Sequence, residues 1–343
     1  MKEIKLNNLS PETGVDKKPT SFIDLKNLSH LETFDTFLSE TPEINYSSKL
    51  DDIIVTGFMK RDDNYQIKVY EGKTHTLRGD IEAHKLLIHK AVLLPDELLA
   101  TVSADQTVKI WRLLGIAMVF EMKLDYVPFD LCVNPETMVA YIFGKSPKIS
   151  CYNIKSGSAV REITTENLEG YNTCVFLEKY NAIVAGVWGQ HILHLINCKT
   201  GKVASQVDAG KDVSSIIGMQ LVEPSSVVTA GNNVIHIWDT WESGIKLRRK
   251  ITPPLKKIAH FTVIEDHDAI LVTHLSPTIY IYKYSDGSLV KFLPTKMQKC
   301  YGIKFARATE KIFVTDAADG AVSVFVNDAD SKKKNSCNTC RIF

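Results

Sequence analysis

The sequence predicts an all-β chain that folds as one ring of seven repeated units. Short apolar runs of strand length alternate with polar turns along most of the chain. A strand that ends in a large side chain recurs every 41 to 44 residues, at Tyr70, Trp111, Tyr152, Leu195, Trp238, Tyr282 and Phe325. A period of about 40–45 residues with four strands per unit is typical of a β-propeller. Seven such units predict a seven-bladed propeller and leave no room in 343 residues for a second folded domain.

The second unit shows the pattern most clearly. An apolar strand meets a Pro-Asp-Glu turn, a second strand leads to a tight turn at Asp105, and a third strand ends at Trp111. This unit resembles a WD40 repeat, and the fifth unit carries the Trp-Asp dipeptide itself at Trp238 and Asp239. The resemblance covers roughly residues 50–326 and implies a WD-repeat propeller.

In WD40 repeats a His, a Ser or Thr, an Asp and a Trp often form a hydrogen-bonded set that braces one blade. The resemblance assigns these roles to His84, Thr101 or Ser103, Asp105 and Trp111. An acid–base pair of His84 and Asp105 is the functional alternative, but the bracing role explains their spacing fully. Trp111 and Trp238 are accordingly expected to be buried.

The same register places the outer strands and the ends of the domain. Outer strands are expected at 118–121, 159–163, 203–207, 245–249 and 289–293. Only 18 residues follow Phe325, so an N-terminal strand at Ser21–Leu25 is expected to complete the last blade and close the ring. Leu28–Ser48 should then supply the innermost strand of the first blade. The predicted organisation is a flexible arm over 1–18, the propeller over 19–328 and a flexible basic tail over 329–343.

Charge and motif content argue against several functions. Lys and Arg total 41 against 40 Asp and Glu, a net charge of +1, whereas a nucleic-acid binder usually has a clear basic excess. The sequence has no glycine-rich phosphate loop, Gly-x-Ser-x-Gly or His-Glu-x-x-His motif, and no apolar run of the ~20 residues that span a bilayer. We therefore expect no catalysis, cofactor, metal or nucleic acid. Five cysteines scattered singly in apolar runs indicate buried free thiols in a reducing cytosol.

WD-repeat propellers generally hold other proteins, so the resemblance implies a scaffold or adaptor with protein partners. An enzyme that uses a pocket at the propeller axis remains an alternative. A soluble adaptor whose Cys340 is never modified is a further alternative.

One basic stretch departs from the even balance of charge. It comprises Lys246, Arg248, Arg249, Lys250, Lys256 and Lys257, on the outer strand of the fifth unit and the loop that follows. On a regular strand Lys246, Arg248 and Lys250 would share one face. A charged edge strand is the ordinary interpretation. The alternative is a phosphate or acidic-partner site, since Leu247-Arg248-Arg249-Lys250 is similar to the Phe-Arg-Arg-Gly motif of phosphoinositide-binding propellers, with its Phe and Gly replaced.

The last four residues look like a C-a-a-X prenylation box. Cys340 would carry the lipid, and Phe343 favours a geranylgeranyl group. Cys337 is a candidate for palmitoylation, and Lys332–Lys334 could add attraction to anionic lipid. One lipid chain alone binds a membrane marginally, so these supply the second signal that stable anchoring needs. The expected location is cytoplasmic, peripheral on the cytosolic face of a membrane.

Overall fold

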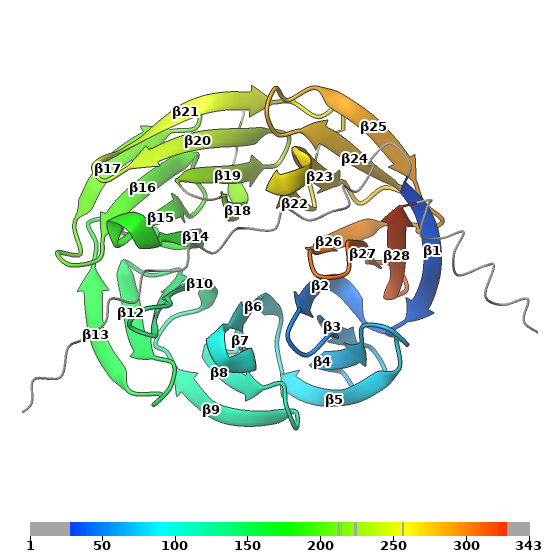
Figure 1. Cartoon of the computed structure of the whole chain (residues 1–343). Coiled ribbons are helices and arrows are strands. Elements are labelled where there is room, and N and C mark those ends of the chain that lie inside the picture. The colour runs from blue at the N-terminus through cyan, green and yellow to red at the C-terminus, as the bar shows by residue number, and fades with distance from the viewer. Residues whose placement is uncertain (1–27, 212, 214, 223–224, 256, 328–343) are drawn as a thin grey trace, which may run out of the picture.

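The computed structural model describes residues 28–327 apart from 212, 214, 223–224 and 256. Within this part of the chain the strands form seven four-stranded sheets, arranged as blades around a central axis (Figure 1). Each sheet is antiparallel throughout. The predicted all-β, seven-bladed propeller is confirmed.

The blades are numbered in chain order, and the strands of each are given from the axis outward. Blade 1 contains β2 (Ser39–Ser47), β3 (Asp52–Met59), β4 (Asn64–Glu71) and β5 (Leu77–His84). Blade 2 contains β6 (Ile88–Leu94), β7 (Leu98–Ser103), β8 (Thr107–Arg112) and β9 (Ala117–Lys123). Blade 3 contains β10 (Pro128–Asn134), β11 (Val139–Gly144), β12 (Lys148–Asn153) and β13 (Ala159–Thr164). Blade 4 contains β14 (Tyr171–Leu177), β15 (Ala182–Val187), β16 (Ile192–Asn197) and β17 (Val203–Asp208).

The second half of the ring repeats this arrangement. Blade 5 contains β18 (Ile216–Val222), β19 (Ser226–Gly231), β20 (Ile235–Trp241) and β21 (Gly244–Ile251). Blade 6 contains β22 (His260–Ile264), β23 (Ala269–Thr273), β24 (Thr278–Lys283) and β25 (Leu289–Pro294). Blade 7 contains β26 (Cys300–Ala306), β27 (Lys311–Asp316), β28 (Ala321–Asn327) and, from the N-terminal side, β1 (Leu28–Asp35). Short 3-10 turns occur at η2 (Pro95–Glu97), η3 (Glu178–Tyr180) and η4 (Glu265–His267). The five outer strands placed from the sequence are all present.

The ring is closed by an N-terminal strand, but at a different position from the one predicted. β1 (Leu28–Asp35) pairs with β28 from Leu28 opposite Asn327 to Asp35 opposite Ala321. The prediction for Ser21–Leu25 is therefore wrong, because β1 already fills the outer place; Ser21–Leu25 itself lies outside the described residues. The segment assigned to one innermost strand holds two strands, separated by a turn at Thr36, whose hydroxyl donates to the carbonyl of Gly320 at 2.5 Å.

The repeated large side chain also needs one correction. Tyr70, Trp111 and Trp238 each pair with the second residue of the preceding strand. Each also lies just after a β-bulge in the pairing with the outer strand. In blade 4 the residue at this position is Ile196, which faces Ile183, and not Leu195. Leu195 and Ile196 are both fully buried, so the sequence lacks the alternation that would have separated them.

The hydrophobic core lies between the blades. The described residues form seven buried clusters, and each cluster joins two neighbouring sheets. Trp111 and Trp238 are 3% and 0% exposed, as predicted. The five cysteines at 132, 151, 174, 198 and 300 are free and buried, which confirms the expected buried thiols. Each blade therefore depends on both neighbours for its stability.

Candidate interaction face and axial channel

The direction of the strands defines two faces of the ring. Strands within a blade are antiparallel. The innermost and third strands therefore begin on one side of the ring, and the outer strand ends there; this side is here called the top face. The opposite side is the bottom face. Leu28 and Asn327 pair with each other at the bottom, since β1 begins and β28 ends there.

Several innermost strands carry a bulge at their second residue, on the top face. The pairing with the next strand skips His89, Phe129, Asn172 and Ile217. A residue left out of the ladder is free to turn its side chain aside. All four line the axial channel, a cavity of about 400 Å³ to which innermost strands of every blade contribute.

Apolar side chains gather around the mouth of this channel. Phe129 and Trp188 stack with their ring centres 4.5 Å apart and their planes at 11°, and His89 meets Phe129 edge-on at 4.9 Å. Seven large apolar side chains exposed by 37–80% lie in top loops or strand starts: Phe37, Leu86, Leu168, Trp188, Ile217, Leu255 and Leu275. These exposed apolar groups make the top face a candidate interaction site.

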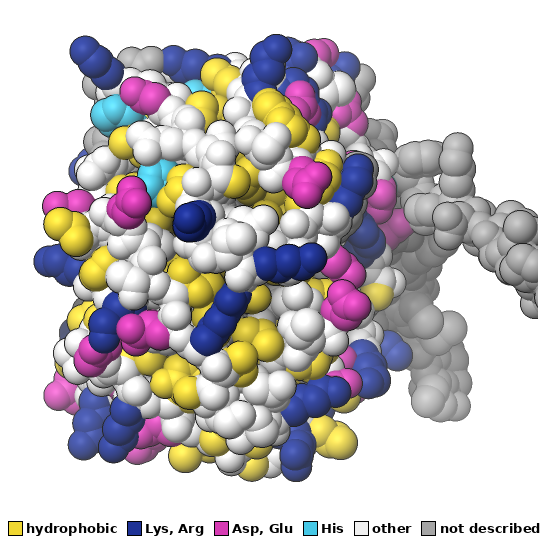
Figure 2. All heavy atoms as spheres, turned by 90° about the vertical axis from the view of Figure 1, so that its left-hand side faces the viewer, with side chains coloured by type: hydrophobic (Ala, Val, Ile, Leu, Met, Phe, Trp, Pro, Cys, Tyr) yellow, Lys and Arg dark blue, Asp and Glu magenta, His cyan; other side chains and the backbone are white. Residues whose placement is uncertain are grey.

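The side wall of the propeller has a different composition. Figure 2 shows Lys and Arg interspersed with Asp and Glu over the outer strands, with apolar side chains between them. Exposed apolar residues occur there too, among them Val160 on β13 and Val203 on β17. Charges of both signs that alternate over a surface favour solubility more than one specific partner.

Polar side chains in the channel join neighbouring blades. Glu43 accepts a hydrogen bond from the backbone N–H of Ala91 at 2.8 Å. Asp130 accepts from the backbone N–H of Cys174 and the hydroxyl of Thr173, both at 3.1 Å. The side-chain amide of Gln220 accepts from and donates to the backbone of Val263. Backbone groups on the inner edges of these sheets would otherwise lack hydrogen-bond partners, and a side chain of the adjacent blade supplies one.

The pKa values in the channel follow from burial and charge. Burial raises the pKa of Asp130 to about 6, against the opposing effects of Lys90 and the hydrogen bonds it accepts. The carboxylate of Glu43, 3.1 Å away, raises the pKa of Lys90. Burial, assisted by Lys90 and Lys304, lowers the pKa of His260 to about 3, so its imidazole is neutral at pH 7. Both carboxylates are thus held by donors that fix the blades.

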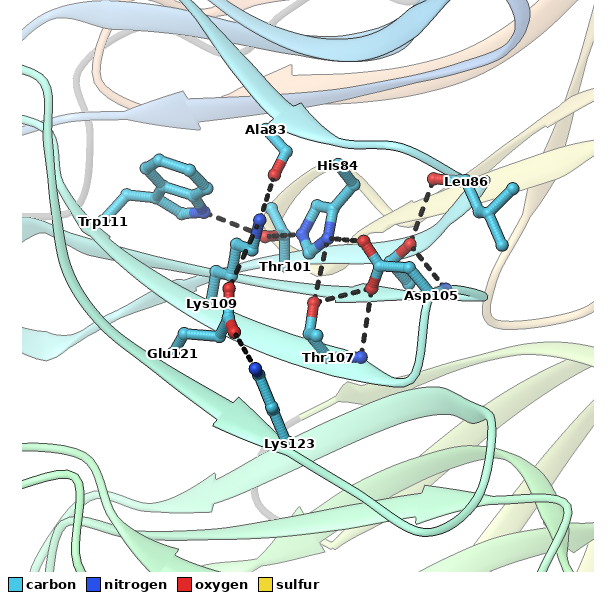
Figure 3. Close-up of polar contacts among 11 residues, drawn as sticks. Ala83, His84, Leu86, Thr101, Asp105, Thr107, Lys109, Trp111, Glu121 and Lys123 are labelled. Carbon is cyan, nitrogen blue, oxygen red and sulfur yellow. Dashed lines mark hydrogen bonds and ion pairs between the residues drawn. The ribbon is translucent and has the colours of Figure 1, made fainter.

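The predicted bracing set is present in blade 2, and Figure 3 shows its connections. Asp105 accepts from His84 Nδ1 at 2.9 Å, His84 Nε2 lies 2.7 Å from Thr101 Oγ1, and Trp111 Nε1 donates to the same oxygen at 2.9 Å. The His84 side chain is 0% exposed and that of Asp105 17%. The chain of hydrogen bonds is internally complete, which supports the bracing role over an acid–base pair.

The choice between Thr101 and Ser103 is settled by these contacts. Ser103 is not part of this set of hydrogen bonds. Its hydroxyl donates to the carbonyl of Leu86 at 3.0 Å and accepts from the N–H of Asp105. Thr101 is the member of the set, so the assignment of Ser103 is wrong. Both side chains on β7 are fully buried, and Ser103 braces the Asp105 turn instead.

Blade 5 has only part of such a set. Trp238 Nε1 donates to Thr229 Oγ1 at 2.9 Å. Asp239 is half exposed and forms an ion pair with Arg248 at 2.6 Å. The Trp-Asp dipeptide therefore combines one core residue with one surface residue.

The basic stretch is less available than its sequence suggests. The pairing of β20 with β21 skips Arg248, so the regular alternation expected for Lys246, Arg248 and Lys250 does not hold. Arg248 binds Asp239, and its guanidinium lies 5.7 Å from the ring centre of Tyr284. Arg249 donates to the carbonyl of Asp286 at 2.8 Å. The two arginines thus link blades 5 and 6.

The remaining residues of the basic stretch and the C-terminal tail lie partly or wholly outside the described residues. Lys257 is exposed, whereas Lys256 lies outside the described residues. Cys337, Cys340 and Lys332–Lys334 lie outside them as well. The described residues contain no helix long and apolar enough to cross a membrane. Nor do they contain a group of three or more His, Cys, Asp or Glu that could hold a metal ion.

Comparison with known proteins agrees with the fold. The chain is similar to the solved β-propeller domain of Cps50 (Swd1) from Myceliophteria thermophila, with a TM-score of 0.75 and 11% identity, over 88% of this chain and 99% of that one. No family model and no curated protein matches the sequence. At this identity the likeness shows the seven-bladed propeller fold alone.

The charged residues of the axial channel were not predicted from the sequence. Lys90, Asp130 and Lys304 each stand in an otherwise largely apolar innermost strand, and charged residues are almost never buried without a partner. That placement was the available signal. The stack of Phe129 on Trp188 gave no signal, because the two residues lie 59 positions apart in the sequence.

Proposed function

We propose that this chain is a non-catalytic scaffold that binds other proteins through its top face. The observation that carries this is the set of exposed apolar side chains on the top face, with Trp188 stacked on Phe129, which lines the axial channel. Aromatic residues beside a concave opening are typical anchors of protein interfaces. The rigid ring of seven mutually packed blades holds these anchors in fixed positions.

We further propose that the scaffold is attached to the cytosolic face of a membrane through a prenyl group on Cys340. The support is the C-a-a-X pattern, with Cys337 and Lys332–Lys334 as the second signal. It requires Phe343 to be the terminal residue of the protein in the cell. Intact-mass measurement decides this, since prenylation and processing would leave a lipidated Cys340 as the last residue.

The top face is tested by matched charge substitutions. Trp188→Asp and Leu168→Asp introduce charge into the proposed interface, and Leu114→Asp does the same to a bottom turn where the side chain is 66% exposed. We expect proximity labelling in cells to lose its strongest partners with both top variants and keep them with the bottom variant. Equal partner lists for all three would contradict a top-face scaffold, provided that thermal unfolding shows each variant to be folded.

The membrane proposal is tested separately. Cys340→Ser should move the protein into the soluble fraction without changing its melting temperature, and a prenylation inhibitor should have the same effect. Cys337→Ser should weaken attachment rather than abolish it, because one lipid chain remains. An unmodified chain that still ends in Arg341-Ile342-Phe343 would leave a soluble scaffold.

The phosphoinositide alternative at the basic stretch receives less support. Arg248 and Arg249, the pair that resembles the Phe-Arg-Arg-Gly motif, are both engaged between blades 5 and 6. A headgroup would have to compete with Asp239 for Arg248. We therefore assign this stretch at most a secondary attraction to anionic lipid.

A further inference from the structure

The axial channel distributes its charge unevenly. Lys90 on β6, Lys304 on β26 and His260 on β22 line one part of the wall together with Glu43 on β2. Asp130 on β10 also lines the channel and acts on Lys90, and its carboxylate is already bound by three donors. The two carboxylates of the channel thus make their direct contacts with Lys90 and with backbone or hydroxyl donors, and not with Lys304.

Glu43 is fully engaged on that side. One of its oxygens lies 3.1 Å from Lys90 Nζ, and the other accepts the N–H of Ala91 at 2.8 Å. Lys304 has neither a hydrogen bond nor an ion pair among the described residues. Glu43 therefore makes its direct contacts with Lys90 and Ala91, and it acts on Lys304 only at longer range, without an ion pair.

Lys304 is held in an unfavourable environment. Its side chain is only partly exposed, and its pKa is lowered by burial and by the charge of Lys90. His260 Nδ1, which is buried, also has no hydrogen-bond partner. A partly buried ammonium group without an ion-pair partner and a buried polar atom without a hydrogen bond both cost free energy. An anion bound between them would remove both costs.

We propose that the axial channel binds a phosphate group between Lys304 and Lys90, with the neutral imidazole of His260 as a further donor. Two lysines suit phosphate, which they hold as point charges, whereas planar carboxylates are better matched by arginine. The cavity of about 400 Å³ falls in the usual size range of small-ligand sites. The ligand is thus a phosphate-bearing molecule narrow enough to enter the channel from a face of the ring.

The test uses the purified full-length protein and inorganic probes. Pyrophosphate and phosphate are titrated against sodium chloride of equal ionic strength at pH 7.5, by calorimetry and by thermal unfolding. We expect saturable binding of both, tighter for pyrophosphate, and a rise in melting temperature that chloride does not produce. A titration without saturable binding overturns the proposal.

Variants locate the site. Lys304→Gln should reduce affinity for pyrophosphate at least tenfold, and the exposed Lys246→Gln on β21 should leave it unchanged. Since Lys304→Gln and Lys304→Met remove a partly buried charge without an ion-pair partner, we expect both to fold and to melt no lower than the natural protein. Equal binding by the Lys304 variants overturns the proposal, because the probe then sits elsewhere. Saturable binding of acetate instead of phosphate overturns the choice of ligand.

A vesicle arm separates the two sources of such a phosphate. Flotation with phosphatidylcholine vesicles containing a phosphoinositide is compared for the Cys340→Ser and the Cys340→Ser, Lys304→Gln proteins. Lys304-dependent flotation supports the site and assigns it to a lipid headgroup. Binding of soluble pyrophosphate without Lys304-dependent flotation supports the site and assigns it to a soluble ligand.

Discussion

Replacing Thr101 by valine should measure what the bracing set of blade 2 contributes. The substitution keeps the shape of the side chain and removes the one oxygen that both His84 and Trp111 contact, at 2.7 and 2.9 Å. The indole N–H and His84 Nε2 would then be buried without partners. Each unsatisfied group costs ~1–3 kcal/mol, so the free energy of unfolding should fall by about 2–6 kcal/mol.

The assay is urea unfolding followed by far-UV circular dichroism, with Thr101→Ser as the control that keeps the oxygen. Trp111→Phe removes the indole donor, so Thr101→Val should cost about 1 kcal/mol less in that background than in the natural chain. If Thr101→Val and Thr101→Ser differ by less than about 0.5 kcal/mol, the hydrogen-bonded chain does not brace the blade.

Three further outcomes follow from the same structure. Deleting residues 1–27 should leave the melting temperature nearly unchanged. Deleting residues 1–35 removes β1 and exposes the edge of β28, so it should lower the melting temperature by many degrees. Equal effects of the two deletions would contradict closure of the ring by β1. Trp238→Ala should cost ~3–5 kcal/mol, and Asp239→Asn, which breaks an ion pair between side chains 35% and 50% exposed, less than ~1 kcal/mol, both read by urea unfolding. Burial lowers the pKa of His274 to about 4, so the unfolded chain binds a proton there at a higher pH than the folded one, and stability is lost as the pH falls below 6.5. Between pH 7.5 and 5 the free energy of unfolding of the natural protein should therefore fall by about 2 kcal/mol more than that of His274→Gln. Equal losses in the two proteins would show that His274 is not buried as described.

The spacing of the large side chains predicted the fold because four antiparallel strands and their turns impose a nearly constant length on each unit. The prediction failed where burial removed its cue. Leu195 and Ile196 are both fully buried, so neither strand periodicity nor residue size could select between them. The bulge at Arg248 has no residue signature either, and it decides where that guanidinium points.

The closing strand was missed for a related reason. Leu28–Asp35 alternates between buried and exposed positions only loosely, since its pairing with β28 shifts between His30 and Glu32. The partnerships of the channel were beyond sequence reasoning because they join separate blades: Glu43 reaches β6 and Asp130 reaches β14. Such contacts depend on ring closure, which brings residues far apart in the chain together at the axis.

The positions of the termini connect the two proposals about function. Leu28 and Asn327 pair at the bottom of the ring, and 12 residues lie between Asn327 and Cys340, a span of at most ~45 Å when fully extended. A lipid on Cys340 would therefore attach the molecule through a tail that begins on the face opposite to Trp188. A tail of this length lets the ring turn and present either face, so the apolar top face stays accessible to proteins of the cytosol.

Moving the anchor tests whether the top face must stay free of the membrane. In the Cys340→Ser protein, an N-terminal sequence that is both myristoylated and palmitoylated should restore membrane attachment and partner labelling, because the chain enters the ring at Leu28 on the bottom face. A helical hairpin of two membrane-spanning segments inserted into the top loop over 165–170 leaves both halves of the ring on the cytosolic side. It should restore attachment but hold the top face against the lipid, and partner labelling should stay low. Equal partner labelling from both anchors would contradict the top-face assignment.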